Sequence, residues 1–214
     1  MSDIFREIEE DLQRDRYQKL WDKYGNLVIA AAVALVLGTA GWQAWKANKI
    51  KHDEAFGARY AEAVKLAENG KADQAEQDFA KLTVDAGAGY SALSRLQEAS
   101  LLAKAGKLED AIAVYDKLAS DSAVDRPYRD LAAYLSVLHG VDTGDPAVLS
   151  KRLEPLTAAS SPWRHSALEL SALLAERAGD MARARQIYAQ LADDATAPQG
   201  VRARAAEMLA ALKG

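Results

Sequence analysis

The sequence of 214 residues contains no cysteine, and aromatic residues make up only 7% of it. Without cysteine there is no disulfide framework, no thiolate nucleophile and no cysteine-ligated metal. The chain also lacks a basic excess, with 27 Lys and Arg against 31 Asp and Glu, which argues against a nucleic-acid-binding protein. Half of the residues are hydrophobic, too many for a disordered chain. Alanine recurs throughout and favours helices.

Catalytic and cofactor-binding motifs are missing as well. No glycine-rich phosphate loop, nucleophile elbow or paired-carboxylate motif occurs in the sequence. His52, His139 and His165 have no second ligand three or four positions away, so we interpret them as surface or packing residues. Acidic pairs such as Asp193-Asp194 are expected to favour a helix dipole or to face water. The sequence therefore predicts a protein that is not an enzyme and uses no cofactor or metal.

One long stretch near the N-terminus is free of charge. Residues 25–45 contain no charged side chain, and as a helix they would span about 30 Å, the thickness of the hydrocarbon core. Trp21 and Tyr24 precede this run and Trp42 and Trp45 close it, as expected at the headgroup level. A buried core helix would show a polar face, and a signal peptide would not follow an acidic segment of 24 residues. We predict an uncleaved transmembrane helix over residues 25–45.

Small residues recur on one face of this predicted helix. Ala30, Ala34 and Gly38 are spaced by four positions, and Gly41 follows one turn later. Small side chains on one face let a second helix approach closely. These four residues form the candidate transmembrane helix-packing face, although an alanine-rich span also produces such spacing by chance.

The segment before the span, residues 1–24, has the pattern of an amphipathic helix. Ile4, Phe5, Ile8 and Leu12 fall at helical spacing, so this stub either rests on lipid or docks on a cytoplasmic partner. Positive charges do not decide the orientation, because the flanking segments 14–23 and 46–59 carry four basic residues each. A short cytoplasmic stub with the long C-terminal part exported is the simpler arrangement for an uncleaved anchor.

The rest of the chain contains an internal repeat. Three glycines are each preceded by alanine at seven positions and followed by alanine, an aromatic residue and leucine at 5, 9 and 12 positions. Because the three later positions share one helix face, each copy predicts a helix hairpin that turns at the glycine. The copies are Ala63, Gly70, Ala75, Phe79 and Leu82; Ala99, Gly106, Ala111, Tyr115 and Leu118; and Ala172, Gly179, Ala184, Tyr188 and Leu191.

One further unit fits between the second and third copies, because Gly106 and Gly179 are 73 residues apart and one step is 36. Gly144 supplies its turn in a degenerate form, in which leucine replaces the small alanine. This replacement predicts looser packing, and Pro155 is expected to end the second helix early. The residues at the three repeat offsets are Leu149, Leu153 and Leu156.

These hairpins resemble tetratricopeptide repeats, although the Trp-x-x-Leu-Gly-x-x-Tyr opening is absent. The predicted fold is all-α, with a single transmembrane helix followed by a tetratricopeptide-like solenoid of about four units and a C-terminal capping helix. The predicted domains are a cytoplasmic stub (1–24), the span (25–45), a linker (46–53), the repeat domain (54–195) and the capping helix (198–213).

A solenoid of this kind acts through a binding surface that is lined mainly by its first helices. Aromatic and arginine side chains there hold extended or partly folded peptides by stacking and hydrogen bonding. For each of these side chains, ordinary packing between repeats is the alternative. The candidate groove residues are Tyr60, Arg95, Tyr128, Arg129, Tyr134, Trp163 and Arg164.

One uncleaved span before a short solenoid resembles the YfgM-like family, the ancillary subunits of the bacterial Sec translocon. The junction of anchor and first repeats carries the likeness most specifically. The matching residues are Asp3 to Asp11 at the start, Trp21-x-x-Tyr24-Gly25, Gly41-Trp42-x-x-Trp45, Tyr60 in an alanine-rich helix, and Tyr90-x-Ala92-Leu93-x-x-Leu96.

The resemblance implies a single-pass protein of the bacterial inner membrane, with a cytoplasmic N-terminus and a periplasmic solenoid. It also implies a place beside the Sec translocon, a membrane-anchored periplasmic chaperone of the peptidyl-prolyl isomerase type as partner, and assistance to unfolded exported proteins. It carries over no catalytic residues. The alternative is a scaffold that joins cell-envelope complexes, in division or outer-membrane assembly, without binding clients.

Overall fold

The structure, a computed structural model, describes residues 2–212, with side chains described for residues 21–27 and 29–212. Within residues 2–212 every regular element is a helix and no strand occurs. The chain divides into two units, Met1–Glu54 and Ala55–Gly214, and helix α1 (Ser2–Glu68) contributes to both. The predicted all-α fold is confirmed.

In the first unit, α1 continues through the predicted stub, span and linker as one helix. It is the one helix in the described chain that is long and apolar enough to cross a membrane, and the chain buries none of its apolar window. Leu27, Leu35 and Leu37 are each 67 or 68% exposed. Such a helix is compatible with single-pass anchoring.

The predicted helix-packing face is open in the single chain. Ala30, Ala34, Gly38 and Gly41 are exposed, and a Cβ added at either glycine would meet no atom within 4 Å. Whether a second helix covers this face stays a prediction. The amphipathic pattern of the stub rests mainly on the side chains of residues 4–20, which lie outside those that the structure describes.

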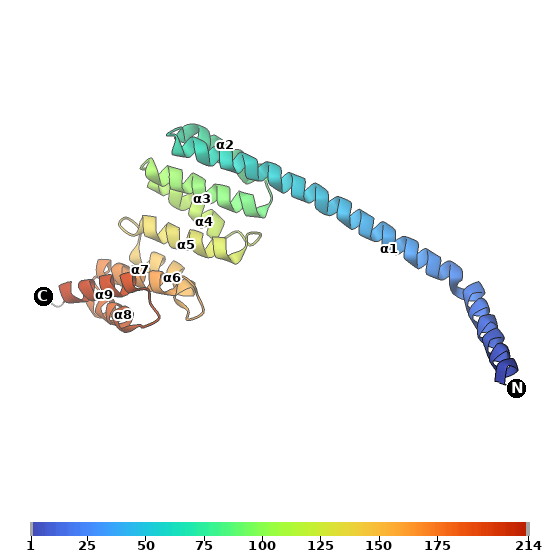
Figure 1. The fold of residues 1–214 in the computed structure, drawn as a ribbon. Coiled ribbons are helices and arrows are strands. Elements are labelled where there is room, and N and C mark those ends of the chain that lie inside the picture. Colours follow the sequence, from blue (N-terminus) through green and yellow to red (C-terminus); the bar gives the residue numbers. More distant parts are fainter. Residues whose placement is uncertain (1, 213–214) are drawn as a thin grey trace. The chain divides into compact units, whose positions relative to one another are not determined.

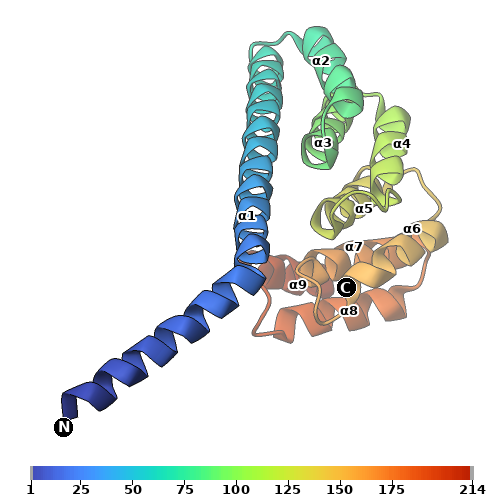
Figure 2. The same ribbon diagram turned by 90° about the vertical axis from the view of Figure 1, so that its right-hand side faces the viewer.

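The second unit is a stack of four helix hairpins and a final helix, which follow one another in chain order (Figures 1 and 2). In the first hairpin the end of α1 packs against α2 (Ala72–Asp85), and in the second α3 (Ala88–Lys104) pairs with α4 (Leu108–Ala119). In the third, α5 (Arg126–Gly140) pairs with α6 (Pro146–Leu153) and the 3₁₀ helix η1 (Glu154–Thr157). In the fourth, α7 (Arg164–Arg177) pairs with α8 (Met181–Asp193), and α9 (Gln199–Ala211) packs against α8.

Three hairpins close around the repeat residues that the sequence indicates. The turn glycines Gly70, Gly106 and Gly179 have φ angles of 76°, 78° and 79°, a left-handed conformation that glycine adopts without a Cβ clash. The two alanines and the leucine of each copy are fully buried, and the aromatic residue is at most 2% exposed. Each of these hairpins therefore turns at glycine and brings its two helices together at alanine.

The third hairpin differs from the sequence expectation at Gly144, which does not have the left-handed φ of the other turn glycines. This glycine provides room instead, because a Cβ on it would lie 2.9 Å from Cδ1 of Leu149 and 3.0 Å from the carbonyl oxygen of Gly140. The backbones of α5 and α6 approach one another less than those of α3 and α4 or of α7 and α8, which agrees with the predicted looser packing. Leu149 is nevertheless only 4% exposed, because Gly140 and Gly144 leave room for its side chain. α6 ends at Leu153, before Pro155, as predicted.

The first helices of successive hairpins lie next to one another. Backbone contacts join α3 to α5, α5 to α7, and α7 to α9, whereas no comparable set joins α2 to α4, α4 to α6 or α6 to α8 among the described residues. The stack is therefore tighter on the side of its first helices, and these helices line its inner side, as in other helical solenoids.

Replacing Gly106 with alanine is expected to lower the free energy of unfolding by about 1–2 kcal/mol, because a Cβ is strained at a left-handed φ. Gly89→Ala is the matched control. Gly89 lies within α3 with no atom within 4 Å of an added Cβ, and alanine favours the helix, so stability should stay equal or rise. Urea unfolding of the full chain in detergent micelles, followed by circular dichroism, measures both. Equal losses in the two variants would contradict the role of the turn.

Candidate functional site

An open groove of about 410 Å³ lies between α5, α7 and α9, on the inner side of the hairpin stack. Its apolar surface comes from Leu138 on α5, Leu170 and Leu173 on α7, and Met208 on α9. Leu138 remains 39% exposed, although it is a large aliphatic side chain. Binding sites for other molecules are commonly concave and mainly apolar with a few placed polar groups. This groove is therefore the candidate binding site.

Two charged side chains of the groove form an ion pair with two hydrogen bonds. Arg204 on α9 donates from Nε and Nη2 to the two carboxylate oxygens of Glu169 on α7, at 2.6 and 2.8 Å. Such a two-bonded pair has a defined geometry and holds α9 against α7. Glu207, three residues further along α9, adds a second carboxylate to the lining. The groove thus carries two acidic groups and one basic group, and the basic group is already paired.

Two tyrosines supply neutral polar groups to the groove. Burial raises the pKa of Tyr134, and the Glu169 carboxylate raises it further. Burial also raises the pKa of Tyr188, with an additional contribution from the neighbouring Glu176 carboxylate. Both phenols therefore stay protonated at physiological pH. Tyr188 is only 2% exposed and forms the base of the groove, whereas the partly buried Tyr134 stands at its wall.

Of the seven residues predicted for the groove, Tyr134 lines it, and Trp163 packs against the Tyr134 ring. Their rings stack with centroids 5.4 Å apart and planes 23° apart. Trp163 is partly buried against the core of the third and fourth hairpins, and it stands immediately before α7 rather than within it. The stack fixes the position of the Tyr134 ring at the groove wall.

Arg95 and Arg164 are also predicted for the groove, but the structure gives both of them another partner. Their side chains are only 18 and 23% exposed, and each pairs with an aspartate at the end of the second helix of its own hairpin. In three hairpins this aspartate stands 15 residues after the turn glycine. We call these contacts the hairpin ion pairs. They join Arg59 to Asp85 at 3.1 Å, Arg95 to Asp121 at 2.7 Å, and Arg164 to Asp194 at 2.8 Å.

The other three predicted groove residues pack between helices. Tyr60 lies against Phe79, with ring centroids 5.6 Å apart, and its hydroxyl accepts a hydrogen bond of 3.2 Å from Gln97. Tyr128 packs against the core that α3, α4 and α5 share. Arg129 is half-buried beside this core, and its Nε has no hydrogen-bond partner in the described structure. A role in binding for these three residues stays a prediction.

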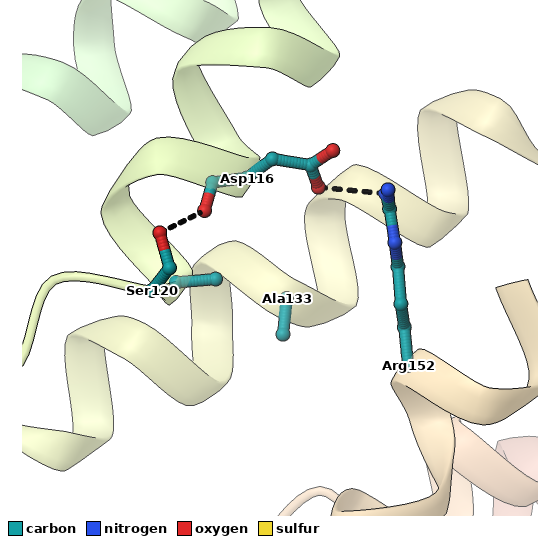
Figure 3. Close-up of a pocket in the computed structure, with 5 residues that line it drawn as sticks. Asp116, Ser120, Ala133 and Arg152 are labelled. Atoms are coloured by element: carbon teal, nitrogen blue, oxygen red, sulfur yellow. Dashed lines mark hydrogen bonds and ion pairs between the residues drawn. The ribbon is translucent and has the colours of Figure 1, made fainter. Parts of the chain in front are cut away.

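A second cavity, of about 310 Å³, lies between α4, α5 and α6 (Figure 3). Arg152 points from α6 toward Asp116 on α4, with a nitrogen–oxygen distance of 2.7 Å. The buried Ser136 hydroxyl donates to Asp116 at 2.5 Å and accepts from Arg152 at 2.9 Å. Because the three groups satisfy one another, we interpret them as a structural link between the second and third hairpins. Among the described residues, no three His, Asp or Glu side chains are grouped as metal ligands.

The sequence did not indicate Leu138, Glu169, Arg204 or Glu207 as site residues. They come from three helices, and no short motif joins them. The hairpin ion pairs, by contrast, had a visible signal. Arginine and aspartate are 26 residues apart in both the first and second hairpins, which follows the period of the repeat.

Comparisons with known proteins agree with this architecture. A family model described as a tetratricopeptide repeat-like domain matches residues 18–213. A solved structure described as "MamA RS-1 ArsTM double mutant" is similar over 74% of this chain and 92% of that chain, with 15% sequence identity and a TM-score of 0.56, a likeness that concerns the fold. A search of curated proteins gave no match. Helical repeats of this kind are typically non-catalytic scaffolds for protein–protein interaction.

The ion pair of the fourth hairpin, between Arg164 and Asp194, predicts a pH dependence of stability. The Thr196 hydroxyl and the Arg164 guanidinium hold the pKa of Asp194 well below its ordinary value of 3.8. A carboxyl whose pKa is lower in the folded state stabilises the fold above its ordinary pKa, and this stabilisation is lost as the pH falls through the lowered value. Asp194→Asn is therefore expected to lower the urea midpoint at neutral pH, by an amount that shrinks as the pH falls below 3.8.

Asp193→Asn is the matched control, because Asp193 is the exposed neighbour in sequence. Its urea midpoint should follow that of the unchanged protein across the pH range. A deficit of Asp194→Asn that stayed constant while the pH fell would show that the asparagine acts through packing and not through the carboxylate charge.

Proposed function

Because the chain belongs to the tetratricopeptide repeat-like domain family, we propose that it is a non-catalytic, membrane-anchored binding protein that assists newly exported proteins at the Sec translocon. α1 anchors it in the bacterial inner membrane with a cytoplasmic N-terminus, and the repeat unit lies in the periplasm. The repeat unit binds unfolded exported chains or a membrane-anchored chaperone of the peptidyl-prolyl isomerase type.

One observation carries this proposal: the chain joins an apolar helix with no cover of its own to a repeat unit with an open apolar groove. An apolar helix that its own chain does not cover marks a site for lipid or for another protein, and a concave, mainly apolar groove marks a site for a ligand. Lipid accounts for the exposed face of α1. A polypeptide accounts for the groove, because its side chains can fill the apolar surface.

The translocon and the periplasm enter the proposal through the likeness of the anchor region to the YfgM-like family. The span closes on Trp42 and Trp45, whose rings lie 5.3 Å apart, and Tyr60 follows in an alanine-rich segment of the same helix. Lys49 places its ammonium group 5.7 Å from the Trp45 ring centroid, an arrangement suited to the membrane–water interface.

The mechanism is weak binding made effective by tethering. A single groove of this size holds only a short segment of polypeptide, so one contact is weak. Anchoring in the same membrane as the export channel raises the local concentration of emerging chains around the repeat unit. Weak contacts then suffice to hold a segment briefly and release it to the next partner.

The membrane arrangement predicts a clear outcome for topology reporters. Alkaline phosphatase, which is active only outside the cytoplasm, is expected to be active when fused to the C-terminus and inactive when fused to the N-terminus. The full chain should stay in the pellet after alkaline carbonate washing, because an inserted apolar helix is not displaced by charge neutralisation. An inactive C-terminal fusion, or release by carbonate, would remove the periplasmic part of the proposal.

Site-specific photo-crosslinking tests the binding role in cells. A crosslinker at position 138, in the groove, is expected to capture many newly exported proteins while export is active. The matched control is position 148 on α6, where Val148 is 50% exposed outside the groove, and it should capture few of them. Capture of a single fixed partner at position 138, independent of export, would instead support a scaffold that joins cell-envelope complexes.

A further inference from the structure

We propose that the groove between α5, α7 and α9 selects polypeptide segments in which a lysine or arginine stands beside large aliphatic side chains. This inference deepens the proposed function and rests on it in one respect, that the ligand is an unfolded polypeptide. It adds a chemical preference, which comes from the charges and the apolar surface of this one groove.

The apolar part of the preference follows from side chains that the chain leaves uncovered. Leu138 is 39% exposed, and Leu173 and Met208 are half-buried around the same groove of about 410 Å³. Burying an aliphatic side chain against these three residues removes apolar surface from water on both partners. A segment with serine in place of leucine would lose this contribution.

The charged part follows from the balance of groups around the groove. Arg204 donates from Nε and Nη2 along one edge of its guanidinium to the two carboxylate oxygens of Glu169, so the two opposite charges offset one another. The Glu207 carboxylate is exposed at the same groove. Because Arg204 and Glu169 offset one another, the Glu207 carboxylate is the charge of the lining that no ion pair holds in the described structure. This carboxylate favours a cationic side chain and disfavours an acidic one.

The apolar surface and the exposed carboxylate of the groove lie next to each other. Glu207 and Met208 are neighbours on α9, so the exposed carboxylate stands beside the apolar surface. Tyr134 and Tyr188 are neutral, because burial raises the pKa of both phenols, so they do not discriminate between cationic and acidic side chains. The preference therefore rests on Leu138 for the aliphatic side chain and on Glu207 for the cation.

Fluorescence anisotropy with three matched peptides tests this preference, using the full chain in lipid nanodiscs. The first peptide has leucines flanked by lysine, the second has glutamate in place of lysine, and the third keeps lysine but has serine in place of leucine. The lysine peptide is expected to bind about fivefold more tightly than the glutamate peptide at low salt, with a smaller difference at high salt. The serine peptide should bind at least about tenfold more weakly, since burial of its side chains contributes little.

Two variants assign the preference to the groove. Leu138→Asp is expected to weaken the lysine peptide about tenfold, whereas Val148→Asp, at a 50% exposed position on α6, should leave binding unchanged. Glu207→Lys replaces one exposed charge on α9 and should abolish or invert the preference for the lysine peptide. Its control is Glu62→Lys, an exposed position in the first hairpin. Circular dichroism verifies that each variant is folded. If Leu138→Asp does not fold, Glu207→Lys still tests the preference.

Several results would overturn the inference. These are equal binding of the lysine and glutamate peptides, a lysine preference that survives Glu207→Lys, or self-association through the groove in place of peptide binding. Failure of the proposed function gives a different pattern. A lysine preference in nanodiscs without crosslinks to exported chains would keep this inference and remove the role in export. Crosslinks to exported chains at position 138 without any peptide preference would do the reverse.

Discussion

The close approach of two helices at a pair of buried alanines is the contact on which the repeat unit depends. Ala63 meets the second helix of its hairpin near Ala75, and the same pairing recurs in the second and fourth hairpins, with both alanines fully buried. Because the helix axes come close there, one aromatic side chain per hairpin suffices to fill the remaining space. A left-handed glycine is needed to reverse the chain over so short a distance.

The third hairpin shows what this constraint allows. Leu149 stands where the other hairpins have alanine, and the chain accommodates it by having Gly140 and Gly144 opposite. The side chain of Leu149 is thus buried although the two helices are more widely spaced than in the second and fourth hairpins. The hairpin ion pair is replaced there by the link from Arg152 to Asp116, which joins neighbouring hairpins rather than the two helices of one. Both arrangements stiffen the stack whose inner side carries the groove.

The proposed function assigns membrane anchoring and binding to different helices of the chain. The exposed leucines of α1 fit a hydrocarbon environment, and the groove at α5, α7 and α9 combines aliphatic side chains with carboxylates. A lipid tail makes no favourable contact with a carboxylate, whereas a polypeptide in water can contact both the aliphatic side chains and the carboxylates. In the proposed function the two surfaces therefore take different partners, and the tether raises the local concentration of ligand at the groove.

The sequence by itself determined the all-helical class, the apolar helix and the turns at Gly70, Gly106 and Gly179, because local spacing decides which residues share a helix face. It also indicated Tyr134. Only the tertiary structure decided that Arg95 and Arg164 pair with aspartates, that Gly144 gives room to Leu149, and that Leu138 and Glu207 share one groove. The ion pairs and the groove are contacts between residues far apart in the chain, and the room at Gly144 depends on where the turn places Leu149. They depend on how the hairpins curve against each other, which the spacing within one helix does not specify.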